Sequence, residues 1–398
     1  MPATGPANIN PKMLAWARGE GGWLPEQVAR RLQVKPERVV AWEGGDRRPT
    51  LRQVEKLARF FHRPLSVFFQ DAPPDLPPLA SEYRRLPGVH VGAESPALLL
   101  AIRRMSSRRE LTLDLASELG EDLPSFELVA HLRDSPKAVG ARLRTHLALS
   151  LETQLSWANE WQAWRAWRTA AEDAGAQVFQ FAGVELAEAR GVSLLHWPHP
   201  AVGVNSKERV PQAKTFTLLH ELVHLMLARG HEERPALFED RDEEQWTSVE
   251  RFAESAASHA FVPEEGLRQT IEALHHPQTG WSLDEVRRLA RRFWMTPAAF
   301  ATRLRESGFM PWGRYQQWRD EWAAHVATLP VRAGGFATQA EKAVSRAGRP
   351  FTKLVLEAMA ANRITSVDAA RYLELKFHHF DDLRALLIGS GAGPGNDV

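Results

Sequence analysis

Residues 214–229 read KTFTLLHELVHLMLAR, and this stretch decides how we interpret the rest of the chain. Apolar residues would lie on nearly every side of a helix formed here, and such a helix is normally buried. It nevertheless carries His220, Glu221 and His224, and burying three ionisable side chains is costly unless something satisfies them. The two histidines lie one turn apart on one face, so both imidazoles can reach one ion. The HExxH spacing therefore predicts two zinc ligands, with Glu221 beside them as a general base. The alternative is a chance match on a core helix, and the apolar surroundings favour the metal site.

A third ligand has to come from elsewhere, because catalytic zinc sites usually have three protein ligands and a water. The chain has no cysteine, which excludes disulfides and thiolate ligands and leaves carboxylates or a later histidine. Residues 248–263, SVERFAESAASHAFVP, predict a second helix on which Glu250 and Glu254 lie one turn apart on one face. Helix geometry alone does not choose between these two carboxylates. His259 lies about 180° around the helix from Glu250 and should point away from the site.

Short β-branched stretches precede the HExxH helix. QVFQF (177–181), VSLLHW (192–197) and AVGVN (201–205) are bounded by Gly or Pro and predict strands. A small sheet in this position suits a metallopeptidase, because an edge strand can pair with an extended peptide and present it to the metal. Residues 95–174 predict several helices, with 107–120 equivocal.

The N-terminal segment differs from the rest in its charge. Residues 1–70 contain 12 Lys/Arg against 6 Asp/Glu, whereas the whole chain has a net charge of only +1. Proline and threonine at favoured starting positions predict short helices in this segment. Their expected ranges are 11–18, 25–32, 36–43, 50–61 and 64–69. A tight turn between the second and third of them has helix-turn-helix spacing.

The run EQVARRLQVKPERVVAWEGGDRRPTLRQVEKLARFF (26–61) resembles the phage-repressor type (Xre/Cro) helix-turn-helix. The resemblance implies that the third helix enters the major groove of duplex DNA. Exposed positions near the start of that helix are then the expected base contacts, and nearby arginines the expected phosphate contacts. These candidates are Lys35, Glu37 and Arg38 for the bases, and Arg30, Arg31, Arg47 and Arg48 for the phosphates. Val40 and Ala41 depart from the family, in which polar residues are common there. A helical module for protein contact or dimerisation is the alternative.

The central part of the chain resembles the ImmA/IrrE family of zinc metallopeptidases. The pattern consists of a strand ending in Asn205, then FTLLHELVH, then E-x-x-A-x-x-x-A from Glu250 to Ala257, closed by Pro263. The triplet Tyr83–Arg84–Arg85 also looks like the members of this family that carry an Xre-type N-terminus. The resemblance implies one Zn²⁺ per chain, held by two histidines and a glutamate.

The same resemblance implies that Glu250 is the third ligand. Glu254 stands where the family usually has Asn, and we expect it either to hold a ligating histidine through its outer nitrogen or to be an alternative ligand. Val223 stands where Gly is usual. The segment 232–254 carries nine Asp/Glu against three Arg, and we interpret it as a solvated acidic loop rather than a second ion site.

At 398 residues the chain should form two or three domains. We expect a helix-turn-helix domain at 1–70, a Pro-rich linker at 71–80 and a metallopeptidase domain at 81–330. The last of these should comprise a helical lead-in (81–174) and a catalytic core (175–265). Residues 331–398 should form a C-terminal helical module with a flexible tail. The predicted fold class is mainly α with a small β-sheet (α+β): an all-α N-terminal domain, a zincin-like domain and the helical module.

The sequence shows no signal peptide, and its longest apolar runs are about six residues, so a cytoplasmic protein without a membrane partner is expected. Our hypothesis is a DNA-binding regulatory zinc metallopeptidase. The resemblance implies that its substrate is a helix-turn-helix repressor, cleaved to derepress stress-response or mobile-element genes. The alternative is a transcriptional regulator or antitoxin whose zinc fold is structural or a sensor. The sequence leaves open whether the chain forms a homodimer.

Overall fold

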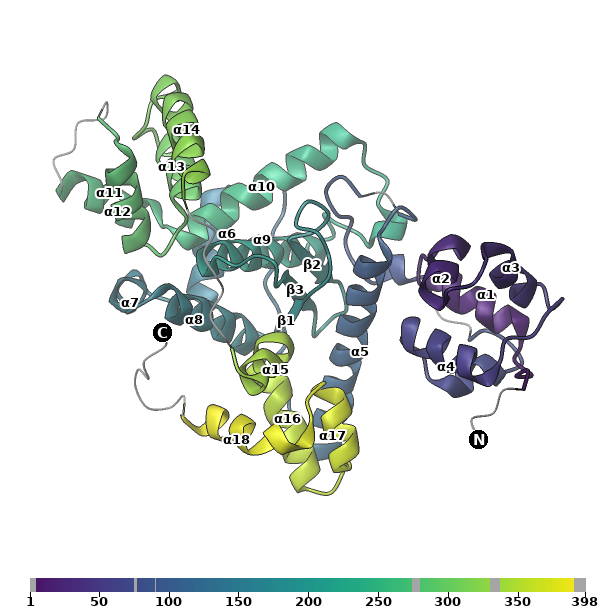
Figure 1. Ribbon diagram of the computed structural model, residues 1–398. Coiled ribbons are helices and arrows are strands. Elements are labelled where there is room, and N and C mark those ends of the chain that lie inside the picture. Colours follow the sequence, from purple (N-terminus) through teal and green to yellow (C-terminus); the bar gives the residue numbers. More distant parts are fainter. Residues whose placement is uncertain (1–4, 75–76, 90, 274–279, 330–336, 390–398) are drawn as a thin grey trace.

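The computed structural model describes residues 5–74, 77–89, 91–273, 280–329 and 337–389. Helices dominate this part of the chain, and a three-stranded sheet lies at its centre (Figure 1). The N-terminal helices lie on one side of the sheet, α11–α14 on the opposite side, and α15–α18 below it in this view. The predicted fold class, mainly α with a small sheet, is confirmed. Residues 75–76 of the expected linker lie outside the described residues, as do residues 331–336 and 390–398 of the expected C-terminal module and its tail.

The N-terminal domain is a bundle of short helices. They are α1 (Pro11–Glu20), α2 (Pro25–Leu32), α3 (Pro36–Glu43) and α4 (Leu51–Phe60), followed by the 3-10 helix η1 (Leu65–Phe69). Proline stands at the start of the first three, and the Thr50 side chain caps α4 by accepting from the Gln53 amide. The bundle has its own core, with Val39 and Trp42 of α3 fully buried. The five helices expected from the sequence are therefore present within a few residues.

A long helix, α5 (Pro96–Leu119), runs between the N-terminal domain and the sheet (Figure 1). In its first half, Arg104 contacts His62 of the N-terminal domain. The next residue, Met105, packs on Gly203 of the sheet, where an added Cβ would lie only 2.4 Å from the methionine sulfur. At its end, Leu115 joins the core of the C-terminal module. The equivocal stretch 107–120 is thus helical as far as Leu119, and Leu115 packs it against the C-terminal module.

The sheet contains β1 (Gln177–Phe181), β2 (Gly191–Leu194) and β3 (Ala201–Asn205) in the order β1-β3-β2. β1 pairs parallel with β3, and β2 pairs antiparallel with β3. The other edge of β2 is taken by the chain itself, since Tyr83 forms an antiparallel bridge with Leu194. This edge of β2 is therefore not open to a peptide in this arrangement, and the pairing of a substrate with an edge strand stays a prediction.

Two helices of 19 residues carry the candidate site beside the sheet: α9 (Pro211–Arg229) and α10 (Glu243–Phe261). α9 packs against β2, β3, α8 and α10, and this explains why its apolar residues surround it on nearly every side. α10 begins five residues earlier than the sequence indicated, because Asp242 and Gln245 form a capping box there. The 3-10 helix η3 (Ala236–Phe238) lies between the two.

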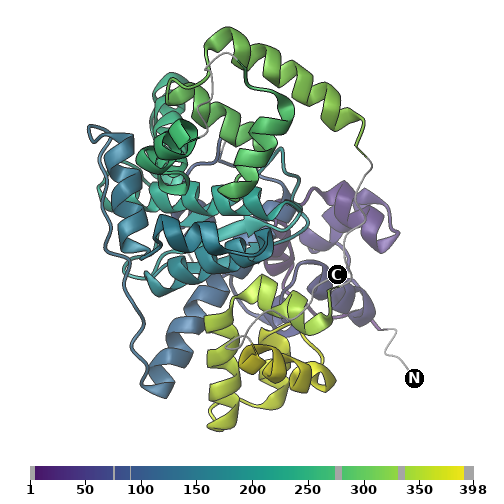
Figure 2. The ribbon, with the colours of Figure 1, turned by 90° about the vertical axis from the view of Figure 1, so that its left-hand side faces the viewer.

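The remaining helices frame this core. The lead-in contains η2 (Leu79–Ser81), α6 (Pro136–His146), α7 (Leu151–Ser156) and α8 (Glu160–Asp173). After α10 come α11 (Glu264–Ala273), α12 (Leu283–Arg292), α13 (Pro297–Glu306) and α14 (Trp312–Ala327). The C-terminal module consists of α15 (Gln339–Ala347), α16 (Arg349–Ala360), α17 (Ser366–Tyr372), η4 (Phe377–His379) and α18 (Phe380–Gly389), and Figure 2 shows it as a separate yellow-green group. Within the described residues, no helix combines the length and the hydropathy needed to cross a membrane.

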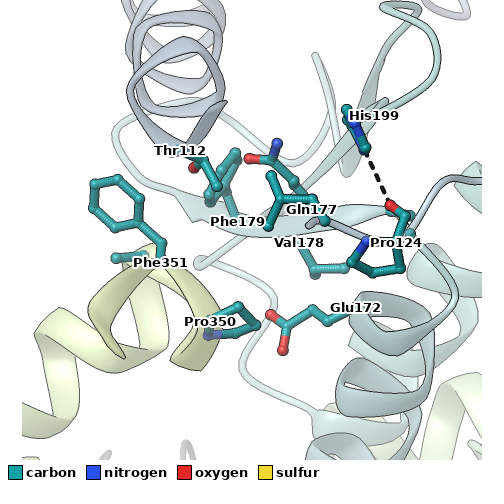
Figure 3. A pocket seen from close by; sticks show the side chains of 13 residues that line it. Thr112, Pro124, Glu172, Gln177, Val178, Phe179, His199, Pro350 and Phe351 are labelled. Carbon is teal, nitrogen blue, oxygen red and sulfur yellow. Dashed lines mark hydrogen bonds between the residues drawn. The ribbon is translucent and has the colours of Figure 1, made fainter. Parts of the chain in front are cut away.

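A pocket lies where the C-terminal module meets the sheet (Figure 3). Thr112 of α5, Phe179 of β1 and Phe351 of α16 line it, together with the carboxylate of Glu172. Burial raises the pKa of Glu172 to about 6, although its ion pair with Arg168 opposes this shift. No residue of α9 or α10 lines this pocket, so it is separate from the HExxH helix.

Candidate metal centre

The HExxH motif lies in the middle of α9, where the helix is surrounded by protein. The Nε2 atoms of His220 and His224 are 3.0 Å apart, so the two imidazoles converge on one point, as the one-turn spacing predicted. The His224 side chain is fully buried, and that of His220 is 14% exposed. Solvent can therefore reach the site from the side of His220, whereas the side of His224 is closed to solvent.

Glu250 of α10 completes the cluster. Its Oε2 lies 3.2 Å from Nε2 of His220, and its Oε1 lies 3.5 Å from Nε2 of His224. The three donor atoms lie within 4.8 Å of one another, and no other described group of His, Asp or Glu side chains converges in this way. Two imidazole nitrogens and one carboxylate oxygen are a donor set found in catalytic zinc sites, so the residues present fit this metal.

Glu233 holds His224 from behind. The Nδ1–H of His224 donates to Oε1 of Glu233 at 2.5 Å, and both side chains are fully buried. This contact fixes the tautomer that leaves Nε2 of His224 directed at the cluster. Burial would lower the pKa of His224, but the carboxylates of Glu233 and Glu250 outweigh it and raise the pKa to about 9.

The structure corrects two expectations about this region. Glu254 is exposed on α10, and the contact expected of it as a partner of a ligating histidine is made by Glu233 instead. Glu254 lies on the same face of α10 as Glu250 but one turn further along the helix. At that position its carboxylate does not reach the histidines. The segment 232–254 is not solvated throughout, since Glu233 is buried among the site residues.

Glu221 lies beside the histidines, and its carboxylate is buried. Its side chain is only 2% exposed. Oε2 accepts from Ser193 Oγ at 2.6 Å and from Arg84 Nε at 3.2 Å, and Oε1 accepts from Arg84 Nη2 at 3.1 Å. A carboxylate offers about four lone pairs, so these three bonds leave one on Oε1 for a water molecule.

Gly191 makes room for this carboxylate. A Cβ added at Gly191 would lie 2.5 Å from Oε1 of Glu221, closer than real Cβ contacts allow. The first residue of β2 therefore has to be glycine for Glu221 to occupy its position. Burial would raise the pKa of Glu221, but the charges of Arg84 and His224 together outweigh it and hold the pKa below its usual value.

Sequence reasoning did not place Arg84, Ser193, Gly191 or Glu233 in the site. Arg84 was noted only as part of a family triplet, yet it contacts both Glu221 and Glu250 across 137 and 166 residues of chain. No local pattern reports contacts over such separations. The one available signal was Glu233 itself, an acidic residue soon after the HExxH helix.

The candidate DNA-contacting side chains all lie at the surface of the N-terminal domain. The residues expected in and around the third helix are exposed: Lys35, Glu37, Arg38, Arg47 and Arg48. Arg30 and Arg31 are exposed on α2, and Val40 is exposed on α3. Their roles in binding DNA stay predictions.

Fold and site together define a helix-turn-helix protein with a histidine–glutamate cluster of the kind found in zinc peptidases. Comparison with known families agrees with both parts. Residues 171–305 match the peptidase M78 family described as the IrrE N-terminal-like domain, and residues 14–68 match the family described as Helix-turn-helix. No curated protein matched the chain. The chain therefore combines an N-terminal Xre-type helix-turn-helix domain with an IrrE N-terminal-like peptidase domain, as the sequence resemblance implied.

Proposed function

We propose that this protein is a DNA-binding regulatory zinc metallopeptidase that hydrolyses a peptide bond in a partner helix-turn-helix repressor. The observation that carries the proposal is the convergence of His220, His224 and Glu250 on one point, with Glu221 beside them. In this proposal the three side chains hold one Zn²⁺ per chain. When bound, Zn²⁺ supplies Lewis acidity, which polarises a carbonyl group and makes a water molecule more acidic.

The protein side chains would do the rest of the chemistry. Glu221 takes a proton from the attacking water through the remaining lone pair of Oε1 and passes it to the leaving amine. Ser193 and Arg84 hold the Glu221 carboxylate still, and Glu233 fixes the ring of His224. The apolar surroundings of α9 keep bulk water away, which strengthens each of these electrostatic contacts.

The substrate would approach from the side of His220 and Glu250. Their side chains are 14% and 16% exposed, whereas Glu221, His224 and Glu233 are almost wholly buried. The N-terminal domain would place the peptidase on DNA where a repressor is bound. This brings enzyme and substrate to the same site.

The burial of Glu221 is the observation that favours the alternative, a regulator whose zinc cluster is structural or a sensor. The discriminating experiment compares the wild-type protein with Glu221→Gln, which is nearly isosteric. Each zinc-loaded protein is incubated with purified helix-turn-helix repressors of the host, and new peptide N-termini are identified by mass spectrometry. We expect equal zinc content and a loss of cleavage of about 10²-fold or more in the variant. If neither protein produces new peptide N-termini in any repressor, the protein is a regulator that does not act by proteolysis.

A further inference from the structure

We infer that Arg84 is a positioning residue of the metal centre, holding the carboxylates of Glu221 and Glu250 in fixed relation to each other. This inference rests on the proposed function, because it assigns Arg84 to the same site. It extends that site to a segment that lies 87 residues before the start of the matched peptidase region at residue 171.

The guanidinium of Arg84 donates hydrogen bonds to two carboxylates, those of Glu221 and Glu250. Nε and Nη2 donate to the two oxygens of Glu221 at 3.2 and 3.1 Å, and Nη1 donates to Oε1 of Glu250 at 2.9 Å. Nη1 also donates to the Arg85 carbonyl at 2.8 Å. The Arg84 side chain is 2% exposed, so water does not compete for these donors. A planar fork with several donors fixes both the distance and the relative orientation of the groups that it joins.

The backbone brings Arg84 to this position in an extended segment that forms isolated bridges with β2 on one side and with Pro235 on the other. The Arg84 amide donates to the Ser193 carbonyl at 3.1 Å, and the Leu195 amide donates to the Glu82 carbonyl at 2.9 Å. On the other side, the Ala236 amide donates to the Tyr83 carbonyl at 2.7 Å. Neighbouring residues of a strand point to opposite faces. Tyr83 accordingly donates to Glu94 away from the metal cluster, while Arg84 points into it.

Simple charge neutralisation does not account for this arrangement. Glu221, Glu233 and Glu250 are carboxylates around one point, and any buried cation would reduce their mutual repulsion. Only a guanidinium can donate in parallel to both oxygens of Glu221 and also reach Glu250. A lysine in place of Arg84 would keep the charge but lose the fork, so the exchange Arg84→Lys separates the two roles.

Cobalt binding tests the inference without a substrate. Co²⁺ accepts the same ligands as Zn²⁺, and its visible absorption depends on their number and geometry. The metal-free full-length chain is titrated with Co²⁺, as wild type, as Arg84→Lys and as Arg85→Lys. Arg85 is the matched control, since it contacts Glu243 and the Arg241 carbonyl outside the cluster.

We expect the wild type and Arg85→Lys to give the same spectrum and affinity. Arg84→Lys should shift the visible bands and bind Co²⁺ about 10–100-fold more weakly, the range for losing a residue that orients a ligand. A wild-type spectrum and affinity in folded Arg84→Lys would overturn the inference and leave Arg84 as a stabilising charge only. Failure of the wild type to bind Co²⁺ would overturn both the inference and the proposed function.

A second comparison covers the case in which Arg84→Lys does not fold. The double variant Glu221→Gln, Arg84→Gln removes both opposite charges together and is compared with Glu221→Gln alone. Glu250 loses its clamp only in the double variant, so its cobalt spectrum should differ from that of the single variant. Identical spectra would overturn the inference.

Discussion

Zinc affinity is expected to rise steeply with pH, because a proton on His224 competes with the metal. Burial and the charge of Arg84 lower the pKa of His224, but Glu233 and Glu250 outweigh them and raise it to about 9. An imidazole must be neutral to bind a metal, so at pH 7 only about one His224 in a hundred is ready to do so. The apparent zinc affinity should therefore increase about tenfold per pH unit from pH 7, about 100-fold in total, before it levels off near pH 9.

The variant Glu233→Gln tests the origin of this pH dependence. Glutamine still offers an oxygen to the Nδ1–H of His224, but the charge that raises its pKa is gone. The rise in zinc affinity should therefore level off at a lower pH than in the wild type. Above pH 9 the variant should bind zinc about 10–100-fold more weakly, because the carboxylate no longer strengthens the ligand. The difference between the two proteins should accordingly grow with pH.

The assay is competition between the metal-free full-length chain and a chromophoric chelator of known proton affinity, from pH 7 to 9.5. Glu232→Gln is the matched control, because the neighbouring Glu232 contacts His131 outside the cluster. A wild-type zinc affinity that stays constant between pH 7 and 9 would refute the reasoning. Parallel curves for the wild type and Glu233→Gln would show that another group sets the pKa.

Three further predictions concern the third ligand, the general base and the DNA-binding surface. Glu250→Ala should lose most zinc binding while Glu254→Ala keeps it, and the reverse result in a zinc titration would exchange their roles. Gly191→Ala places a Cβ 2.5 Å from the present position of Oε1 of Glu221, so the general base has to move. Repressor cleavage should therefore fall about 10²-fold while zinc is retained, and unchanged cleavage would contradict this prediction. In fluorescence anisotropy at several salt concentrations, Arg47→Ala should weaken binding to all DNA duplexes alike, and Arg38→Ala should alter the preference for DNA sequence. If the wild-type protein binds no duplex at low salt, the N-terminal domain is a protein-contact module.

The parts of the molecule that sequence predicted well are those set by local rules. The spacing of His220 and His224 fixes their convergence because one helix carries both. The short N-terminal helices were placed within a few residues, since proline and Thr50 mark their starts. The three strands were found from β-branched residues between Gly and Pro, although β2 ends at Leu194, earlier than expected.

The parts that sequence missed depend on how separate elements pack. Glu250 and Glu254 are equivalent on a helical wheel, and only the height at which α10 crosses α9 distinguishes them. Glu233 lies in an acidic run that composition alone describes as a surface loop, yet the cost of burying its carboxylate is offset by a hydrogen bond from His224. Arg84 reaches the site because the segment that carries it bridges to β2 through Tyr83, a long-range contact that no local pattern encodes.

The position of Arg84 in the chain also determines when the site can form during synthesis. Arg84 leaves the ribosome 137 residues before Glu221 and 166 residues before Glu250. At ordinary rates of translation this takes roughly 10–30 s. The N-terminal domain has its own core and can fold in that time, whereas the extended segment around Arg84 still lacks β2 as its neighbour. A nascent chain therefore contains Arg84 long before it contains Glu221 and Glu250. The cluster can bind a metal only after the chain has been synthesised past α10.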